Sequence, residues 1–448
     1  MAVNMDSSTV RTVLQIIPRL EAGGAERTTL EINRALIEAG WRSIVLTSGG
    51  AMADQVRRDG GTLILGPVES KNPFVIARNG GLISRLVRQH RVDVMHVRSR
   101  APAWSALRAR QQTKIALIST WHGDYRASGP VKRWYNGGLA RADRVIANSN
   151  YTAGRIREGY CDAHPGLDGR IRVIARGADL EEFSRSSVTD GQIAQMHQFW
   201  DIKPGEGQAS AAITGPKSGT KHETNPATRP LIVLLPARMS AWKGHEVAIE
   251  AINNMIRSGH GPEFRLIFLG GRRLDGEIDG VKGNGSLNET NDPGIGYAEP
   301  GSTLERTLRD MVTKYGMDER VKFAGHCSDM AAAYAAADLV IVPSTRAEAF
   351  GRVAVEAGAM GVPVIASDHG GTRETIIDGT TGMLVPPGDA GALGSALTKM
   401  ASLPAADLEK MGNAARAHVS KHYTTAAMAA ATLDVYREVR GGQEGLTA

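Results

Sequence analysis

Residues 12–47 read TVLQIIPRLEAGGAERTTLEINRALIEAGWRSIVLT, and this stretch decides the fold class. A short continuous apolar run, Thr12–Ile17, precedes a glycine-containing turn and a segment with helical apolar spacing, Glu26–Ala39. A second apolar run, Ser43–Thr47, follows. Continuous rather than alternating runs are typical of buried parallel strands, so the stretch predicts one strand–helix–strand unit.

The same alternation continues outward along the chain. Further strands are predicted at 62–65, 92–97, 114–119, 144–147, 171–174, 231–235, 264–269, 321–324, 339–342 and 363–366. Two polar stretches rich in small residues, 201–228 and 272–302, interrupt the pattern. The predicted architecture is α/β, with two Rossmann-like, doubly wound domains facing across an interdomain cleft.

The interruptions suggest four segments. Residues 1–184 are expected to form an N-terminal Rossmann-like domain, and 185–229 a linker or polar insertion. Residues 230–420 are expected to form a C-terminal Rossmann-like domain. Residues 421–448 are expected to be a C-terminal helix that packs back on the N-terminal domain.

The composition narrows the class of protein. The chain has 448 residues, of which 42% are hydrophobic and only two are cysteines, which excludes global disorder and a disulfide-stapled secreted fold. No run of about 18 apolar residues predicts a membrane-spanning helix, and the first residues do not resemble a signal peptide. A cytoplasmic protein is expected.

The positive charge is concentrated in the first third of the chain. Residues 1–150 contain 22 lysines and arginines against 11 acidic residues, while the remainder contains 31 against 36. Nucleic acid, anionic lipid and a phosphorylated substrate all fit this bias. On a helix, Arg78, Arg85 and Arg88 would share one face, as in a membrane-surface helix, although a solvated face is equally consistent. Sparse aromatic residues argue against nucleic acid.

Four groups of residues at predicted strand ends are candidates for chemistry. Gly23, Gly24 and Ala25 open the first helix, where backbone N–H groups can meet an anion, but a plain turn would look the same. The remaining candidates are Arg238 with Lys243, Glu348 with Phe350, Gly351, Arg352 and Glu356, and the histidines His122 and His326.

Each of these groups has a functional and a structural interpretation. Arg238 and Lys243 can converge on one diphosphate or lie in a solvated turn. Glu348 can face a cleft and Glu356 can accept two ribose hydroxyls, or both can be ordinary helix acids. A lone histidine is more often structural than catalytic, but the position of His122 at a strand end makes the two interpretations equally consistent. The pair His418 and His422 lacks the zinc-protease acid, and no metal site is predicted.

Taken in order, these pieces resemble a retaining glycosyltransferase of family 4 with the GT-B fold, from about residue 12 to 390. The most specific stretch, from Val342 to Asp389, is VPSTRAEAFGRVAVEAGAMGVPVIASDHGGTRETIIDGTTGMLVPPGD. It is similar to the family's E-x7-E segment and its following Gly-Gly-x-x-Glu motif. GGAE at 23–26, WHG at 121–123, ADRVIANS at 142–149 and the PAR…KG turn at 236–244 support the resemblance.

The resemblance implies a role for each candidate. Arg238 and Lys243 would neutralise a diphosphate leaving group, and Glu356 would hold the ribose of a nucleotide-sugar donor. Glu348 and the backbone at Phe350 and Gly351 would meet the sugar and phosphates. Gly24 would approach the diphosphate from the other domain, with Gly23 and Ala25 beside it. His122 would lie near the sugar, and His326 and Arg352 would contribute to donor binding.

The implied reaction is metal-independent, front-face transfer of a hexose from a nucleotide sugar, UDP favoured over GDP, with no required cofactor. The expected acceptor is a glycan or lipid-linked glycan in lipopolysaccharide or other cell-envelope polysaccharide synthesis. The basic N-terminal half would bind an anionic lipid surface, so a peripheral position on the inner face of the plasma membrane is expected.

The alternative functions are a nucleotide-sugar epimerase or a phosphorylase on the same scaffold, a non-catalytic nucleotide-sugar-binding protein, or a nucleic-acid-binding protein.

The sequence departs from the family pattern in two motifs. Arg176-Gly177-Ala178-Asp179 stands where the family often has Asn-Gly-x-Asp, and Arg373 stands where a proline usually precedes the motif's glutamate. Arginine cannot supply the turn chemistry of asparagine, and the long cation of Arg176 can approach the cleft.

Overall fold

The computed structural model describes residues 11–21, 23–125, 129–202, 230–259, 263–270 and 303–444. The chain divides into two compact units. Unit 1 comprises residues 1–177 together with 424–448, and unit 2 comprises residues 178–423. The chain therefore passes from one unit to the other twice, after Gly177 and after Tyr423.

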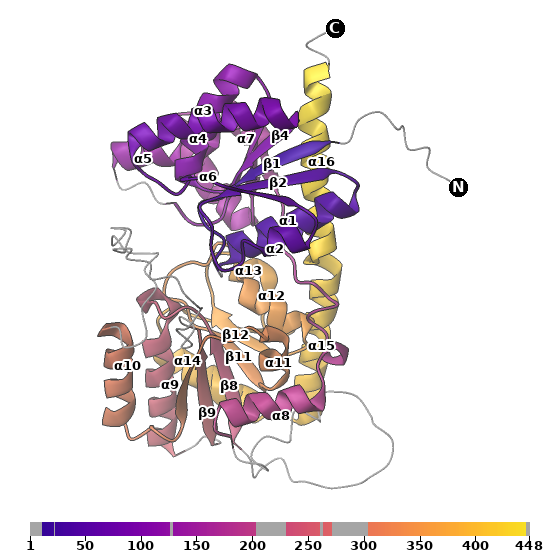
Figure 1. Cartoon of the computed structure of the whole chain (residues 1–448). Helices are drawn as coiled ribbons and strands as arrows, with labels where there is room; N and C mark the ends of the chain where they lie inside the picture. Colours follow the sequence, from indigo (N-terminus) through magenta and orange to yellow (C-terminus); the bar gives the residue numbers. More distant parts are fainter. Residues whose placement is uncertain are drawn as a thin grey trace, which may run out of the picture. The chain divides into compact units, whose positions relative to one another are not determined.

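Unit 1 is built around a seven-stranded parallel sheet (Figure 1) with the order β3-β2-β1-β4-β5-β6-β7. Its strands are β1 (Thr12–Ile16), β2 (Arg42–Thr47), β3 (Thr62–Leu65), β4 (Val94–Val97), β5 (Ala116–Trp121), β6 (Arg144–Ala147) and β7 (Ile171–Val173). The direction of strand succession reverses between β1 and β4. Ligands of open α/β sheets bind beyond the carboxyl ends of strands at such a switch point.

Helices cover both faces of this sheet. The helices of unit 1 are α1 (Gly24–Glu38), α2 (Gln55–Arg58), α3 (Pro73–His90), α4 (Arg100–Thr113), α5 (Pro130–Asn136), α6 (Asn150–Tyr160), α7 (Leu167–Arg170) and α16 (Thr425–Glu444), with a 3-10 turn at Leu139–Arg141. Buried side chains of α3, α4 and α6 pack together on one face. Those of α1 and α16 pack on the other, as Figure 1 shows.

Unit 2 contains a six-stranded parallel sheet with the order β10-β9-β8-β11-β12-β13. Its strands are β8 (Leu231–Pro236), β9 (Phe264–Leu269), β10 (Val321–Gly325), β11 (Leu339–Val342), β12 (Val364–Ser367) and β13 (Gly382–Val385). The switch point lies between β8 and β11, which pair through Leu339 opposite Val233 and Val340 opposite Leu234. The loops that follow these two strands are therefore the expected ligand-binding loops of unit 2.

The helices of unit 2 also form two layers. They are α8 (Asp190–Phe199), α9 (His245–Ser258), α10 (Thr303–Lys314), α11 (Met330–Ala335), α12 (Arg352–Ala359), α13 (Thr372–Thr375), α14 (Ala390–Ala401) and α15 (Ala405–His422), with 3-10 turns at Arg185–Ser187 and Ala241–Lys243. Helices α9, α10 and α14 share one apolar core with the sheet. Helix α12 contacts β11 and β12, and α15 packs on α12.

Part of the range expected to be a linker, 185–229, is a helix. Thr189 and Gln192 form a reciprocal capping box at the start of α8, which fixes the helix where the sequence looked merely polar. Gln192 donates to Asp329 Oδ2 at 2.9 Å, and His197 Nε2 lies 2.9 Å from the carbonyl oxygen of Ala336. Helix α8 is thus part of unit 2. Residues 203–229 and 271–302 lie outside the described residues.

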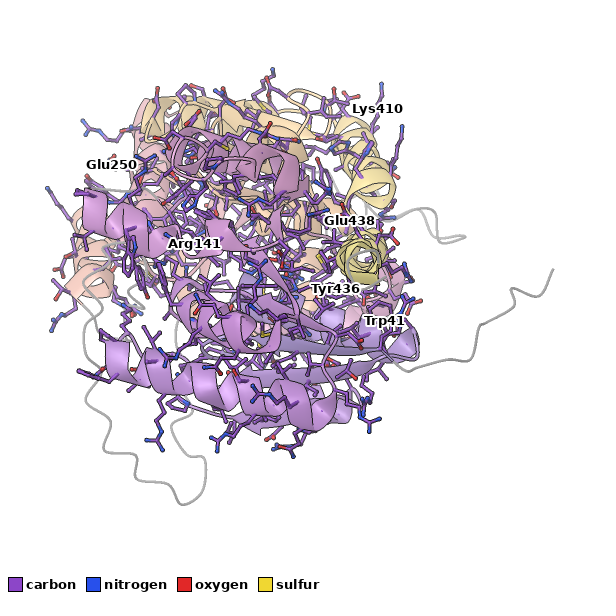
Figure 2. The ribbon with its side chains drawn as sticks, turned by 90° about the horizontal axis from the view of Figure 1, so that it is seen from above. Trp41, Arg141, Glu250, Lys410, Tyr436 and Glu438 are labelled. Carbon is purple, nitrogen blue, oxygen red and sulfur yellow. The ribbon has the colours of Figure 1, made fainter. Side chains whose placement is uncertain are left out.

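The C-terminal helix α16 belongs to unit 1. Its Tyr436 hydroxyl lies 2.7 Å from His96 Nδ1 in the core, and its ring packs against Trp41 at a centroid distance of 6.3 Å (Figure 2). Glu438 of the same helix forms ion pairs with Arg144 and Arg172, on β6 and β7. Residues at the end of the chain therefore complete the core of the unit that the first residues begin.

Within the described ranges, no helix combines the length and the apolar character needed to cross a membrane.

Candidate active site

The switch point of unit 2 brings together two residues that are 105 positions apart. The loop after β8 carries Lys243, and the loop after β11 carries Glu348. Lys243 Nζ lies 2.5 Å from Glu348 Oε1, and the two side chains are only 15% and 14% exposed. Ser344 Oγ donates to the same carboxylate oxygen at 2.7 Å. The sequence predicted both charged residues as parts of a site.

The environment keeps Glu348 ionised. Burial opposes the charged form, but the charge of Lys243, the hydrogen bonds from Lys243 and Ser344, and the charge of Arg238 together lower the pKa of Glu348. Arg238 is half-buried in the loop after β8. The loops after β8 and β11 thus present two cations and one carboxylate, a set with net positive charge that is suited to holding an anion.

Close backbone approaches fix the two loops against each other. The backbone N–H of Thr345 donates to the carbonyl oxygen of Trp242 at 2.8 Å. Gly244 has a φ of +77°, and a Cβ there would stand 1.9 Å from the carbonyl oxygen of Pro343. The Trp242 ring lies under the ammonium of Lys243, 4.1 Å from ring centroid to Nζ. Only glycine at position 244 allows the backbone to follow this path, and the path places Lys243 at the site.

Gly351 begins the neighbouring helix. It is the N-cap of α12 and has a φ of +92°, a left-handed conformation that favours glycine. Gly371 packs directly on this turn, since a Cβ there would lie 2.4 Å from Phe350 Cα, and its N–H donates to the Glu348 carbonyl oxygen at 2.8 Å. The Phe350 side chain is buried against Tyr423, so only its backbone is available at the turn.

Glu356 lies inside α12 and already has partners. Arg352 Nε donates to Oε1 at 2.7 Å, and the Tyr334 hydroxyl donates to Oε2 at 3.0 Å. The side chain is 8% exposed. A carboxylate has about four acceptor positions, so these contacts orient it and leave room for further donors.

The glycine turn of unit 1 starts α1 as predicted from its sequence. Gly23 is the N-cap, and Glu26 folds back over the turn, because a Cβ on Gly23 would lie 2.2 Å from Glu26 Oε2. Ala25 packs against the small apolar cluster beneath α1. An anion approaching Gly24 would therefore meet the Glu26 carboxylate, which would have to swing aside.

His122 directly follows β5 in unit 1. Its Nδ1 lies 2.5 Å from Arg176 Nη2. Burial, then the charges of Arg176 and Arg98 and the nearby His96, lower the pKa of His122 well below its ordinary value. The surroundings of His122 thus favour the neutral imidazole.

His326 does not lie with the other predicted site residues of unit 2. His326 is exposed after the edge strand β10, and β9 separates that strand from β8 at the switch point. Sequence reasoning also missed Ser344, Trp242 and Tyr334. The first two adjoin motif residues and could have been found by that neighbourhood. Tyr334 lies on a different helix from Glu356, so no spacing pattern connects them.

Both units of the chain match models of known protein families. Residues 22–182 match the family model described as Glycosyltransferase Family 4, and residues 218–418 match the model described as Glycosyl transferases group 1. The chain belongs to glycosyltransferase family 4. Its two parallel α/β units are those of the GT-B fold.

Individual proteins that are similar to this chain are also glycosyltransferases. A D-inositol 3-phosphate glycosyltransferase of Saccharomonospora viridis is 28% identical over 309 residues, covering 68% of this chain and 58% of the relative. The chain spans about half the length of the curated relatives it matches. A solved glycosyltransferase of Rickettsia africae has a TM-score of 0.77 and 27% identity, covering 96% of this chain and 98% of that one. Anabaena Alr3699/HepE in complex with UDP-glucose has a TM-score of 0.70 and 21% identity over 95% of this chain and 99% of that one.

Proposed function

We propose that this family 4 member is a retaining hexosyltransferase that uses a nucleotide-sugar donor, UDP favoured over GDP. The observation that carries the proposal is the half-buried Lys243–Glu348 pair beside Arg238, at the switch point of unit 2. In the proposed site, the donor diphosphate lies against these cations and the N–H groups that open α12 at Gly351. The solved Anabaena structure with UDP-glucose is consistent with such a donor.

The charges suit cleavage of a glycosyl–phosphate bond. As the bond between the anomeric carbon and the phosphate oxygen breaks, negative charge grows on the leaving diphosphate. Arg238 and Lys243 stabilise that charge, and they do so without a metal ion. In a front-face displacement, the acceptor hydroxyl attacks from the side of the departing diphosphate, whose oxygen takes the hydroxyl proton.

The two glutamates have different roles in this reaction. Glu348 holds the ammonium of Lys243 through Oε1, and its second oxygen is proposed to accept from a sugar hydroxyl. Glu356, oriented by Arg352 and Tyr334, is proposed to accept from the ribose hydroxyls. Phe350 contributes through its backbone. In unit 1, the turn of Gly23, Gly24 and Ala25 is proposed to meet an anion through its backbone N–H groups.

The acceptor is proposed to be a glycan or lipid-linked glycan of lipopolysaccharide or another cell-envelope polysaccharide. Arg78, Arg85 and Arg88 are all exposed on α3, and Phe74 near its start is 86% exposed. Cations beside an exposed aromatic ring suit an anionic membrane surface, so we propose a peripheral cytoplasmic position. A second candidate is a soluble phosphorylated polyol, favoured by the relatives named D-inositol 3-phosphate glycosyltransferase.

A donor and acceptor screen tests the proposal. The chain is incubated with UDP-glucose, UDP-galactose or GDP-mannose, and with D-inositol 3-phosphate or a lipid-linked glycan, with EDTA present or absent. We expect a UDP-sugar to be consumed, an α-configured product by NMR, and a rate unaffected by EDTA. An inverted anomer contradicts retention, loss of rate in EDTA contradicts metal independence, and isomerisation of the donor without transfer favours the epimerase.

Flotation with liposomes tests the membrane part separately. Binding to anionic vesicles should fall when Arg78, Arg85 and Arg88 are changed to glutamate. Charge reversal of Arg306, Lys314 and Lys399, which are exposed on unit 2, is the matched control and should leave binding unchanged. Equal binding of the wild-type chain to neutral and anionic vesicles would remove this part of the proposal.

A further inference from the structure

Arg176 and His122 form a contact in unit 1 that the family pattern does not anticipate. Arg176 lies just after β7 and is only 8% exposed. Its Nη2 lies 2.5 Å from His122 Nδ1, although the strand β6 separates the strands that carry the two residues. The arginine side chain thus spans the carboxyl end of the sheet to reach the imidazole.

The chemistry of the two groups fixes where the imidazole proton is. A guanidinium has only N–H donors and no acceptor, and it stays protonated. His122 Nδ1 must therefore accept through its lone pair, which leaves the ring hydrogen on Nε2. A protonated imidazole would point an N–H at the guanidinium, so the cation is excluded from this geometry.

We propose that Arg176 is a positioning residue that holds His122 in the neutral Nε2–H tautomer, as a hydrogen-bond donor to an oxygen of the bound substrate. The Nε2 atom is buried and has no hydrogen-bond partner among the described residues. A buried N–H without a partner is costly, and a substrate oxygen would remove that cost on binding. His122 then acts by donating a hydrogen bond and not by transferring a proton.

The groups around His122 support a neutral ring. Arg176, Arg98 and His96 lower the pKa of His122, after burial itself. Tyr125 hydrogen-bonds the His122 backbone, and burial raises the pKa of Tyr125, against the charges of Arg100 and Arg176. The charge of Glu26 also raises the pKa of Tyr125.

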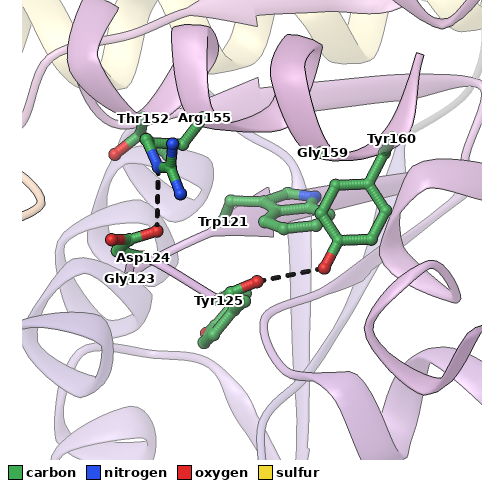
Figure 3. Close-up of a pocket in the computed structure, with 8 residues that line it drawn as sticks. All are labelled: Trp121, Gly123, Asp124, Tyr125, Thr152, Arg155, Gly159 and Tyr160. Carbon is green, nitrogen blue, oxygen red and sulfur yellow. Dashed lines mark hydrogen bonds and ion pairs between the residues drawn. The ribbon is translucent and has the colours of Figure 1, made fainter. Parts of the chain in front are cut away.

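The loop that carries His122 is anchored independently of Arg176. Arg155 Nε lies 3.2 Å from Asp124 Oδ1, and the Tyr160 hydroxyl donates to the Tyr125 carbonyl oxygen at 3.0 Å (Figure 3). The Trp121 ring packs edge-on against Tyr160 at 4.9 Å between centroids. Replacing Arg176 should therefore change the imidazole tautomer while leaving the loop in place.

Nitrogen-15 NMR of the histidine rings tests the inference on the whole chain without substrate. The chain has 12 histidines, and the His122 signals are assigned from their loss in His122→Gln. We expect the wild-type ring to show the Nε2–H tautomer and no titration between pH 5 and 8. In Arg176→Met we expect mixed tautomers, while burial and the charge of Arg98 still keep the pKa of His122 low. Arg176→Lys, which keeps a donor-only cation, should restore the wild-type pattern, and thermal midpoints check that each variant is folded.

The inference rests on the proposed function in one respect only, namely that the oxygen which accepts from His122 belongs to a sugar-transfer substrate. The outcomes of the experiment therefore distinguish failure of the inference from failure of the proposed function. An Nδ1–H tautomer or a protonated ring in the wild type overturns it, as does an unchanged spectrum in Arg176→Met. Where transfer is measured, Arg176→Met should lower kcat/KM about tenfold, the worth of one neutral hydrogen bond, and Arg176→Lys should recover it. The predicted tautomer in a chain that transfers no sugar would count against the proposed function alone.

Discussion

At the scale of single residues, the candidate site depends on pairs that the sequence does not show as pairs. Lys243 and Glu348 were each predicted from a strand-end motif, but their 2.5 Å contact arises only because β8 and β11 are neighbours in the sheet. The Tyr334 contact to Glu356 and the Arg176 contact to His122 arise in the same way. Local patterns predict which residues gather at a strand end, whereas their mutual hydrogen bonds depend on strand order and loop path.

Because of the ion pair, the free energy of unfolding should depend on pH through the titration of Glu348. Its folded-state pKa is lowered relative to the unfolded chain, so the carboxylate stabilises the fold above the ordinary pKa of about 4.3, and this contribution is lost as pH falls through the folded-state value. Glu348→Gln should therefore cost about 2 kcal/mol of unfolding free energy at pH 7, because it leaves the half-buried ammonium of Lys243 without its carboxylate partner. Urea unfolding should show this difference shrinking below about pH 4.5.

The exposed Glu319 provides the control for this experiment. Glu319→Gln should change the unfolding free energy by less than about 0.5 kcal/mol at either pH. A Glu348→Gln cost that stays constant down to pH 3 would contradict the assigned ion pair.

At the scale of elements, continuous apolar runs located most strands to within two residues. Four strands, β3, β6, β9 and β11, have the predicted bounds, and all are runs dominated by apolar or β-branched side chains. The strand β13 was missed, because it begins at a glycine, lies at the sheet edge and is only half-buried at its centre. Helix α8 was missed because its capping box stands in a polar stretch with few apolar residues.

Two glycines that flank α9 predict a difference in stability. Gly244 and Gly259 have similar φ values, +77° and +70°, but a Cβ at Gly244 would meet the Pro343 carbonyl oxygen and one at Gly259 would meet nothing within 4 Å. Gly259→Ala should cost about 1–2 kcal/mol from backbone strain alone. Gly244→Ala should cost clearly more and displace Lys243, which thermal unfolding and donor binding would detect. Equal effects of the two substitutions would contradict the close approach.

The C-terminal helix predicts a second measurable effect. The Tyr436 hydroxyl is the hydrogen-bond partner of His96 Nδ1, and His96 Nε2 lies 2.6 Å from Thr120 Oγ1. Burial, together with the charge of Arg98, lowers the pKa of His96. Tyr436→Phe should cost about 1–3 kcal/mol of unfolding free energy, because it leaves a buried nitrogen without a partner. Tyr315→Phe, at a half-exposed ring of unit 2, is the control and should change little.

At the scale of the whole molecule, charge and chemistry are divided between the units. Unit 2 carries the candidate diphosphate site, and the basic residues of the first 150 positions lie in unit 1, which is proposed to take the acceptor. The family and the α/β architecture were predictable because the motifs are local and ordered along the chain. The identity of the acceptor was not, because charge attracts every anion alike.

The most direct test of the account is calorimetric titration of UDP into the wild-type chain and into Lys243→Ala. Lys410→Ala, which removes an exposed lysine on α15, is the matched control. The account predicts equal UDP affinity for the wild type and Lys410→Ala, and a Kd weakened about tenfold to a hundredfold in Lys243→Ala, as expected for the loss of a hydrogen bond to a charged group. Undiminished affinity in Lys243→Ala, or no UDP binding by the wild-type chain, would contradict it.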